Sequence, residues 1–197
     1  MTHEDVLQRK ASGRIWKGDA RLIGQILWAK QKTDWFNHSW SINLPKRYLL
    51  GKAIFKRVGK MTWVEPPLHV SLGKNITVGD HCYFNYNTTL LDDWTITIGD
   101  HVLIAPNVIV STATHPLPAE LRSDGETITA PVVIEDDVWI GAGSIVLPGV
   151  TIGKGSVIGA GSIVTQDVPP HSLALGVPCK AVREIGEGDR ERFRALL

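Results

Sequence analysis

Residues 138–170 read VWIGAGSIVLPGVTIGKGSVIGAGSIVTQDVPP, and an aliphatic side chain returns there at every sixth position. These positions are Ile140, Val146, Ile152, Ile158 and Val164. A period of six differs from the roughly 3.6 residues of a helix and the alternation of an ordinary strand. It is typical of a solenoid in which each hexad supplies one short strand and one turn, and three hexads close a coil. The stretch therefore predicts a parallel β-helix with these side chains pointing inward.

The hexad series continues upstream of this stretch. In the same phase it includes Ile98, Ile104, Val110, Ile128 and Ile134. After a slip of two residues, the earlier members are Leu72, Val78, Phe84, Leu90 and Ile96. We expect all of these side chains to point into the coil, which would extend over residues 61–178.

The series is interrupted between Val110 and Ile128. The two in-phase positions there are Pro116 and Arg122, which do not suit an inward aliphatic site, and the segment HPLPAELRSDGETITAP is polar and rich in turn residues. We expect the chain to leave the coil as a loop at about 115–131, with His115 at its root. Such a loop on a rigid scaffold is a common place for function, although a plain surface insertion is the alternative.

The flanking segments have a different character from the repeats. Residues 1–60 contain few turn residues, and Leu22, Ile26 and Ala29 share one face of a predicted helix. The WVEPP motif at 63–67 ends this helical segment, because its prolines remove backbone donors. Residues 179–197 are expected to form a C-terminal tail.

The composition is that of an ordinary globular chain. The 197 residues are 43% hydrophobic and 21% charged, and 21 basic against 20 acidic residues give a formal charge of +1. This balance indicates neither nucleic acid nor an anionic membrane as a partner. The chain has no apolar run long enough for a membrane span, and its N-terminus is too polar for a signal peptide. With Cys82 and Cys179 expected as free thiols, we expect a cytoplasmic protein.

Several motifs together resemble one family. They are FNHS, WVEPP, NYNTTLLDDWTITIGDHVLIAPNV, the histidine-proline pair at 115–116, the repeat stretch at 138–170 and GVPCKAVREI. They resemble the galactoside and maltose O-acetyltransferases among the hexapeptide-repeat acyltransferases. The resemblance extends from about residue 36 to about residue 185. The resemblance implies a mainly β fold, a left-handed parallel β-helix with an N-terminal helical segment and a protruding loop. It also implies a homotrimer, with active sites between subunits, that transfers an acetyl group from acetyl-CoA to a sugar hydroxyl.

The resemblance assigns roles on the acceptor side of this site. His115 matches the catalytic histidine and would act as general base, which suits an imidazole that titrates near neutral pH. Ser71, Asn85 and Asp93 match residues that hold the acceptor sugar, and their side chains suit hydroxyl groups. The alternative for Asn85 and Asp93 is ordinary turn chemistry, especially since Asp93 follows Asp92. No metal is expected.

The resemblance also assigns residues to acetyl-CoA, the expected co-substrate. Ala142, Ala160 and Thr165 match contacts along the thioester and pantetheine, and Ala142 could donate only its backbone N–H to the thioester oxygen. Lys180 and Arg183 match basic residues near the nucleotide, where positive charge suits phosphates. Trp139 could line this pocket or be an ordinary core residue.

The sequence departs from the family pattern in three places. The family has an acidic and a basic sugar contact in its N-terminal segment, and counting back from FNHS places Lys17 and Ile26 near those positions. Asp19 and Arg21 could replace them only with a shift of the chain. Gln166 stands where a lysine near CoA is common. These departures leave the identity of the acceptor open.

Two other function classes also fit a β-helix. A zinc carbonic anhydrase needs three converging histidines, and His81 and His101 could meet His115 only through assembly of several chains. A purely structural solenoid would need neither the His115 loop nor the basic C-terminal residues. Metal content and binding of acetyl-CoA distinguish these classes from an acetyltransferase.

Overall fold

Short parallel strands stack into three sheets along a coil in the computed structural model, which describes residues 2–39 and 44–196. Sheet 1 contains β1 (Arg57–Val58), β4 (Ile76–Val78), β7 (Ile96–Ile98), β12 (Val132–Ile134) and β15 (Thr151–Ile152). Sheet 2 contains β2 (Trp63–Val64), β5 (Tyr83–Phe84), β8 (Leu103–Ile104), β13 (Trp139–Ile140), β16 (Val157–Ile158), β18 (Ser172–Leu175) and β19 (Lys180–Glu184). Sheet 3 contains β3 (Leu68–Val70), β6 (Thr88–Leu91), β9 (Ile109–Ser111), β14 (Ile145–Val146) and β17 (Ile163–Val164).

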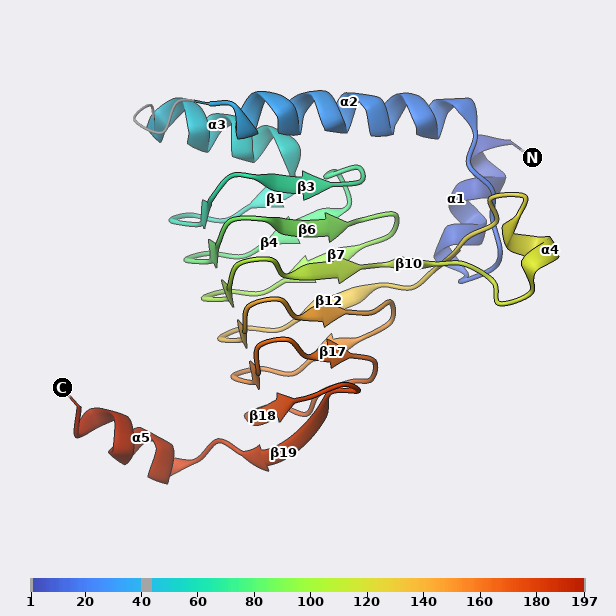
Figure 1. Ribbon diagram of the computed structural model, residues 1–197. Helices are drawn as coiled ribbons and strands as arrows, with labels where there is room; N and C mark the ends of the chain where they lie inside the picture. The colour runs from blue at the N-terminus through green and yellow to red at the C-terminus, as the bar shows by residue number, and fades with distance from the viewer. Residues whose placement is uncertain (1, 40–43, 197) are drawn as a thin grey trace.

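The chain visits sheets 1, 2 and 3 in order and then returns to sheet 1 one level further along the axis. The coil is left-handed, and its levels succeed one another down the axis in Figure 1. Registers are regular even across the interruption, since Val132 lies beside Ile96 and Ile134 beside Ile98. The predicted left-handed parallel β-helix is confirmed.

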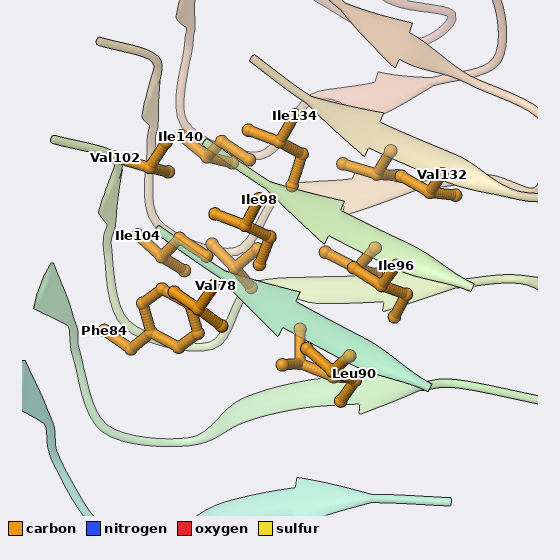
Figure 2. Packing of buried hydrophobic residues seen from close by; sticks show 14 of the residues in the cluster. Val78, Phe84, Leu90, Ile96, Ile98, Val102, Ile104, Val132, Ile134 and Ile140 are labelled. Carbon is orange, nitrogen blue, oxygen red and sulfur yellow. The ribbon is translucent and has the colours of Figure 1, made fainter. Parts of the chain in front are cut away.

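Each strand turns two positions of the hexad inward. The predicted position carries Val78, Phe84, Leu90 and its successors, and the position two residues earlier is buried as well. In β7 both inward positions are isoleucine: Ile96 and Ile98 are each at most 2% exposed. This explains the apparent slip of two residues in the sequence pattern. Figure 2 shows the resulting close packing of aliphatic side chains from several coils, with Phe84 at one edge of the group.

Two members of the predicted inward series are wrong. Leu72 is buried, but in a separate cluster with Val6, Trp16 and Leu22 of the N-terminal segment. Ile128 is only partly buried and lies in the protruding loop. Both positions lie beside points where the chain leaves the regular coil, so spacing alone does not determine where these side chains point.

The loop contains β10 (Ala113–Thr114), α4 (Ala119–Arg122) and β11 (Ile128–Thr129), between β9 and β12. Its two arms pair antiparallel, with Ala113 opposite Thr129. The N-terminal segment holds it from outside, because Trp16 and Thr127 exchange two backbone hydrogen bonds of 2.9 Å. The loop and α1 (His3–Ala11) therefore lie side by side, away from the axis of the coil (Figure 1).

Helices cover one end of the coil. The side chain of Asp19 accepts a hydrogen bond from the Leu22 N–H and so caps α2 (Ala20–Asn37). This helix runs across the end of the β-helix with α3 (Leu44–Ile54) (Figure 1). Leu22 and Ala29 are buried and Ile26 partly buried, so they share the inward face as predicted. Ala29 contributes to the core of the coil itself.

The C-terminal residues are more ordered than a tail. β19 pairs antiparallel with β18, with Leu173 opposite Arg183, and closes the other end of sheet 2. The helix α5 (Glu187–Arg194) follows and extends away from the coil in Figure 1. The six-residue spacing of buried aliphatic residues that predicts the repeats is absent from this antiparallel strand, because every residue of β19 is exposed.

We predict that removing an inward side chain is far more costly than removing an outward one of the same type. Leu90 is fully buried, so Leu90→Ala should lower the free energy of unfolding by about 2 to 5 kcal/mol. Leu103 is 47% exposed on the outer face of β8, and Leu103→Ala serves as the matched control. Thermal and urea unfolding measure both; equal losses would contradict the inward assignment.

Candidate active site

The sequence-predicted residues gather at two corners of the coil. We call the turn from sheet 3 to sheet 1, at residues 71–75, 91–95 and 111–131, the loop corner. The turn from sheet 2 to sheet 3, at residues 85–87, 105–107, 141–143 and 159–161, is called the alanine corner. Ser71, Asp93 and His115 lie at the loop corner, on successive coils. Asn85, Ala142 and Ala160 lie at the alanine corner.

His115 is exposed at the root of the loop, and its ring is oriented by the other arm. Its Nδ1 atom lies 2.7 Å from the backbone oxygen of Glu126. A carbonyl oxygen can only accept, so Nδ1 carries the proton and donates it. Nε2 is then left with a lone pair, which is the form that a general base requires. The antiparallel pairing of β10 and β11 places Glu126 within reach of His115.

Ser71 and Asp93 form a polar pair at the same corner. The Ser71 hydroxyl donates to Oδ2 of Asp93 across 3.2 Å, from the coil above. Both residues are partly exposed. Within the described chain Oδ1 of Asp93 has no donor, so it is available to a bound hydroxyl. On its other side, the backbone oxygen of Asp93 accepts from Lys10 Nζ at 2.8 Å.

Asp92 is a buried carboxylate that sequence reasoning did not single out. Its two oxygens accept from the N–H groups of Leu72, at 2.8 Å, and Asn75, at 3.2 Å. Burial raises the pKa of Asp92 to about 6, although hydrogen bonds from these backbone donors oppose the shift. The two adjacent carboxylates therefore have different surroundings: Asp92 holds the turn that follows Ser71 through hydrogen bonds, and Asp93 faces the solvent side.

The alanine corner presents backbone rather than side chains. A Cβ atom added to Gly141 would lie 2.6 Å from the Ala160 nitrogen, so only glycine permits this close stacking. Ala142 is exposed, and among the described residues its N–H has no acceptor. Asn85 accepts from the Tyr86 N–H through Oδ1 at 2.9 Å, which leaves its amide N–H₂ free to donate. The corner therefore offers donors along a narrow track.

Trp139 is not a core residue. It is 50% exposed on the outer face of β13, between Leu103 and Val157 in the neighbouring strands. Because strands alternate their side chains, its neighbour Ile140 points into the core instead. Trp139 thus contributes to an apolar row beside the alanine corner, and the core interpretation is wrong.

The remaining predicted cofactor residues lie on later coils. Thr165 and Gln166 are exposed and directly follow β17, the last strand of sheet 3. They therefore lie on the same edge of the coil as the loop corner, but on a later coil. Lys180 is exposed at the start of β19. Arg183 donates from both terminal nitrogens to the Asp189 carboxylate at 2.7 Å, and this ion pair raises the pKa of the guanidinium. No motif in the sequence indicates that pairing.

Three of the four N-terminal candidates for the sugar contacts of the family, Lys17, Asp19 and Ile26, are engaged within the chain. Lys17 forms an ion pair of 3.1 Å with Asp124 of the loop. Asp19 uses one carboxylate oxygen to cap α2 and the other to bind His3 at 2.7 Å. Ile26 packs against the N-terminal apolar cluster, and Arg21 is exposed on α2.

The histidines considered for zinc lie elsewhere. The rings of His81 and His101 stack with centroids 5.3 Å apart at the third corner, between sheets 1 and 2, which does not carry His115. Across residues 2–39 and 44–196, no group of three or more His, Cys, Asp or Glu side chains could hold a metal ion. Over the same residues, no helix is both long and apolar enough to cross a membrane.

Comparisons with known proteins agree with this geometry. The family model described as bacterial transferase hexapeptide (six repeats) matches residues 131–166. A galactoside O-acetyltransferase of Escherichia coli (strain K12) is 51% identical over 158 residues, which cover 80% of this chain and 78% of the relative. One from Lactococcus lactis subsp. lactis (strain IL1403) is 44% identical over 176 residues, covering 86% and 84%. A solved structure of a galactoside acetyltransferase in complex with coenzyme A superimposes with a TM-score of 0.92 at 46% identity, covering 94% of this chain and 93% of that one.

The repeating coil and its exposed corner residues define the class of hexapeptide-repeat transferases. Within this class the chain belongs to the galactoside O-acetyltransferase family. It is an acetyl-CoA-dependent O-acetyltransferase, and acetyl-CoA is its co-substrate. This identity replaces both the zinc enzyme and the non-catalytic solenoid as interpretations of the sequence.

We predict that Asp92 makes stability depend on pH. Its pKa of about 6 in the folded chain lies above the usual value of about 3.9, so the folded state binds more protons between these values. The free energy of unfolding should therefore fall by up to about 3 kcal/mol through this group as pH rises from 4 to 7. Asp92→Asn should lack this component. Urea unfolding across this range measures it, and parallel pH curves for the two proteins would contradict the assignment.

Proposed function

We propose that this enzyme transfers the acetyl group to a hydroxyl of a sugar or glycoside, with His115 as general base. The observation that carries the proposal is the 2.7 Å hydrogen bond from His115 Nδ1 to the Glu126 carbonyl. It fixes the tautomer in which Nε2 can accept a proton. The names of the relatives, galactoside O-acetyltransferases, support a glycoside as the acceptor.

His115 acts on the acceptor because a hydroxyl is a weak nucleophile at neutral pH. Nε2 takes the hydroxyl proton while the acceptor oxygen forms a bond to the thioester carbonyl carbon. When the carbon–sulfur bond breaks, the electron pair leaves with sulfur, and the imidazolium returns the proton to it. The products are the acetyl ester and the free thiol of CoA, and His115 regains its starting form.

Ala142 stabilises the negative charge that develops on the thioester oxygen. Its N–H is exposed and lacks an acceptor in the described chain, and the stacking at Gly141 holds this backbone rigidly. A donor fixed in advance costs no reorganisation during the reaction. The glycine and alanine surface next to it admits a thin acyl chain, with Trp139 as an apolar wall.

Ser71, Asn85 and Asp93 bind the acceptor. The Ser71 hydroxyl orients the Asp93 carboxylate, whose Oδ1 accepts from a sugar hydroxyl. The Asn85 amide donates to a sugar oxygen, since its own oxygen is already engaged with the chain. Asp93 and Asn85 are therefore each left with one unused side-chain polar atom suited to a carbohydrate.

Ala160, Thr165, Lys180 and Arg183 bind CoA. Lys180 and Arg183 extend from the last strand of sheet 2, beyond the alanine corner, where the nucleotide phosphates would lie. The Arg183–Asp189 pair does not prevent this role, because it is an exposed ion pair. Such pairs are worth at most about 1 kcal/mol, so a phosphate can replace the carboxylate.

We further propose a homotrimer, because the residues proposed for this site lie at two different corners of a single chain. Asn85 and Asp93 flank β6, one at each end, so they lie at different corners of the same sheet. A three-fold arrangement with sheet 3 facing the axis brings the loop corner of one protomer to the alanine corner of the next. The partly exposed row of Ile109, Ile145 and Ile163 on sheet 3 supports this orientation. The free cysteines favour a reducing cytoplasm.

We predict that His115→Ala lowers kcat by about 10²- to 10⁴-fold and leaves the affinity for CoA nearly unchanged. Release of free CoA with p-nitrophenyl β-galactoside as acceptor gives the rate, and calorimetry gives the affinity. The control is His38→Ala, whose side chain is 79% exposed at the end of α2. A full rate in His115→Ala would refute the base assignment.

Mixed oligomers test the shared site. The variants His115→Ala and Asn85→Ala damage opposite corners, so each alone should have little activity. Every mixed trimer contains one undamaged pairing of corners, and random mixing of equal amounts should restore about a quarter of the wild-type rate. The two variants are mixed after reversible unfolding, or coexpressed. Absence of any recovery would contradict a site built from two protomers.

A further inference from the structure

Lys10 is a buried cation that connects the first helix to the acceptor-binding corner. It is 2% exposed, and its Nζ donates to the backbone oxygen of Asp93 at 2.8 Å, across 83 residues of sequence. The same ammonium lies 4.0 Å from the centroid of the Trp16 ring, a cation–π contact. Residues of α1 thus hold the chain at the point where Asp93 binds the acceptor.

The same short segment holds the loop that carries His115. The Lys10 carbonyl accepts from the Thr129 hydroxyl at 3.2 Å, in the second arm of the loop. Trp16 pairs with Thr127 through two backbone hydrogen bonds, and the preceding residue, Glu126, binds the His115 ring. Residues 10–16 therefore contact both the backbone carbonyl of Asp93 and the arm that orients the base.

We propose that Lys10 is a positioning residue that fixes the placement of Asp93 relative to His115. The proposal rests on the roles proposed above for these two residues. It assigns a function in the reaction to the N-terminal segment, in which Lys17 and Ile26 stand near the positions of the family's acidic and basic sugar contacts. Lys10 does not touch the substrate; it acts through Asp93 and the loop.

The cost of burying Lys10 supports a functional reason for a lysine at this position. Burial lowers the pKa of its ammonium, and the negative charge of Asp93 only partly opposes this effect. An apolar side chain would suit the adjacent cluster of Val6, Trp16 and Leu22 without that cost. What only the lysine supplies is a directed donor to the Asp93 carbonyl.

Lys10→Met tests the proposal, because methionine keeps an unbranched apolar stem and removes the donor. We expect kcat/KM for p-nitrophenyl β-galactoside to fall by about 10- to 100-fold, as for loss of a charged hydrogen bond. The KM for acetyl-CoA should stay within about twofold, because Lys10 contacts none of the residues proposed to bind CoA. Lys32→Met is the matched control: Lys32 also donates to a backbone carbonyl, that of Ala53 at 3.0 Å, on the side of α3.

A second measurement does not depend on the acceptor. Hydrogen exchange of backbone amides in residues 112–131 should speed up at least about tenfold in Lys10→Met, while residues 132–168 keep their protection. Thr129→Val, which removes only the hydroxyl bond to the Lys10 carbonyl, should produce a smaller change of the same kind if Lys10→Met does not fold.

The outcomes separate this proposal from the assignment of the base. Unchanged exchange in 112–131, or unchanged kcat/KM for the acceptor, would overturn the role of Lys10. So would an equal loss in Lys10→Met and Lys32→Met that follows their melting temperatures, since that result shows a structural role only. Failure of the proposed function appears instead as a full rate in His115→Ala, whatever Lys10→Met does.

Discussion

The parallel hydrogen bonding between successive coils is the constraint on which the rest of the structure depends. Each strand must lie directly over its counterpart one coil earlier, as Ile134 lies beside Ile98 and Ile152 beside Ile134. Such stacking allows little variation in coil length, and it requires small residues where backbones approach, as at Gly141. Since every coil turns at the same three edges, residues far apart in sequence are aligned along each corner. A catalytic surface therefore arises along the corners without a cleft within the coil.

The ends of such a stack need protection, because the first and last coils leave apolar side chains and strand edges uncovered. Phe36 of α2 and Ile54 of α3 cover the first end and are each 1% exposed. At the other end β19 folds back on β18 and ends the parallel series with an antiparallel strand. These two ends use different solutions, and both contribute to the proposed active site: the first through the segment that leads into α2, and the other through Lys180 and Arg183 of β19.

The sequence was sufficient for the fold and for the position of the protruding loop. Hexad spacing predicts the coil, and loss of phase at Pro116 and Arg122 predicts the loop with His115 at its root. Spacing could not predict where side chains point at the margins, so Leu72 and Ile128 were misplaced. It also could not reveal contacts between distant segments, such as the hydrogen bond from Lys10 to Asp93. The hydrogen bonds that the buried Asp92 carboxylate accepts from the Leu72 and Asn75 N–H groups are a second example. Those contacts depend on the final packing of α1 and of the turns against the coil, which no local pattern encodes.

The loop leaves and re-enters the coil at almost the same point. The Ala130 N–H donates to the Thr112 carbonyl at 3.0 Å, and Thr112 donates in turn to the Leu91 carbonyl of the coil above. The path of the coil from β9 in sheet 3 to β12 in sheet 1 thus continues as though residues 113–129 were an appended module with a closed base. Doubling the length of such a loop adds only about 0.6 kcal/mol of closure entropy. The scaffold can therefore accept loops of new length and composition at this junction, while the stacking of the coil stays unaltered.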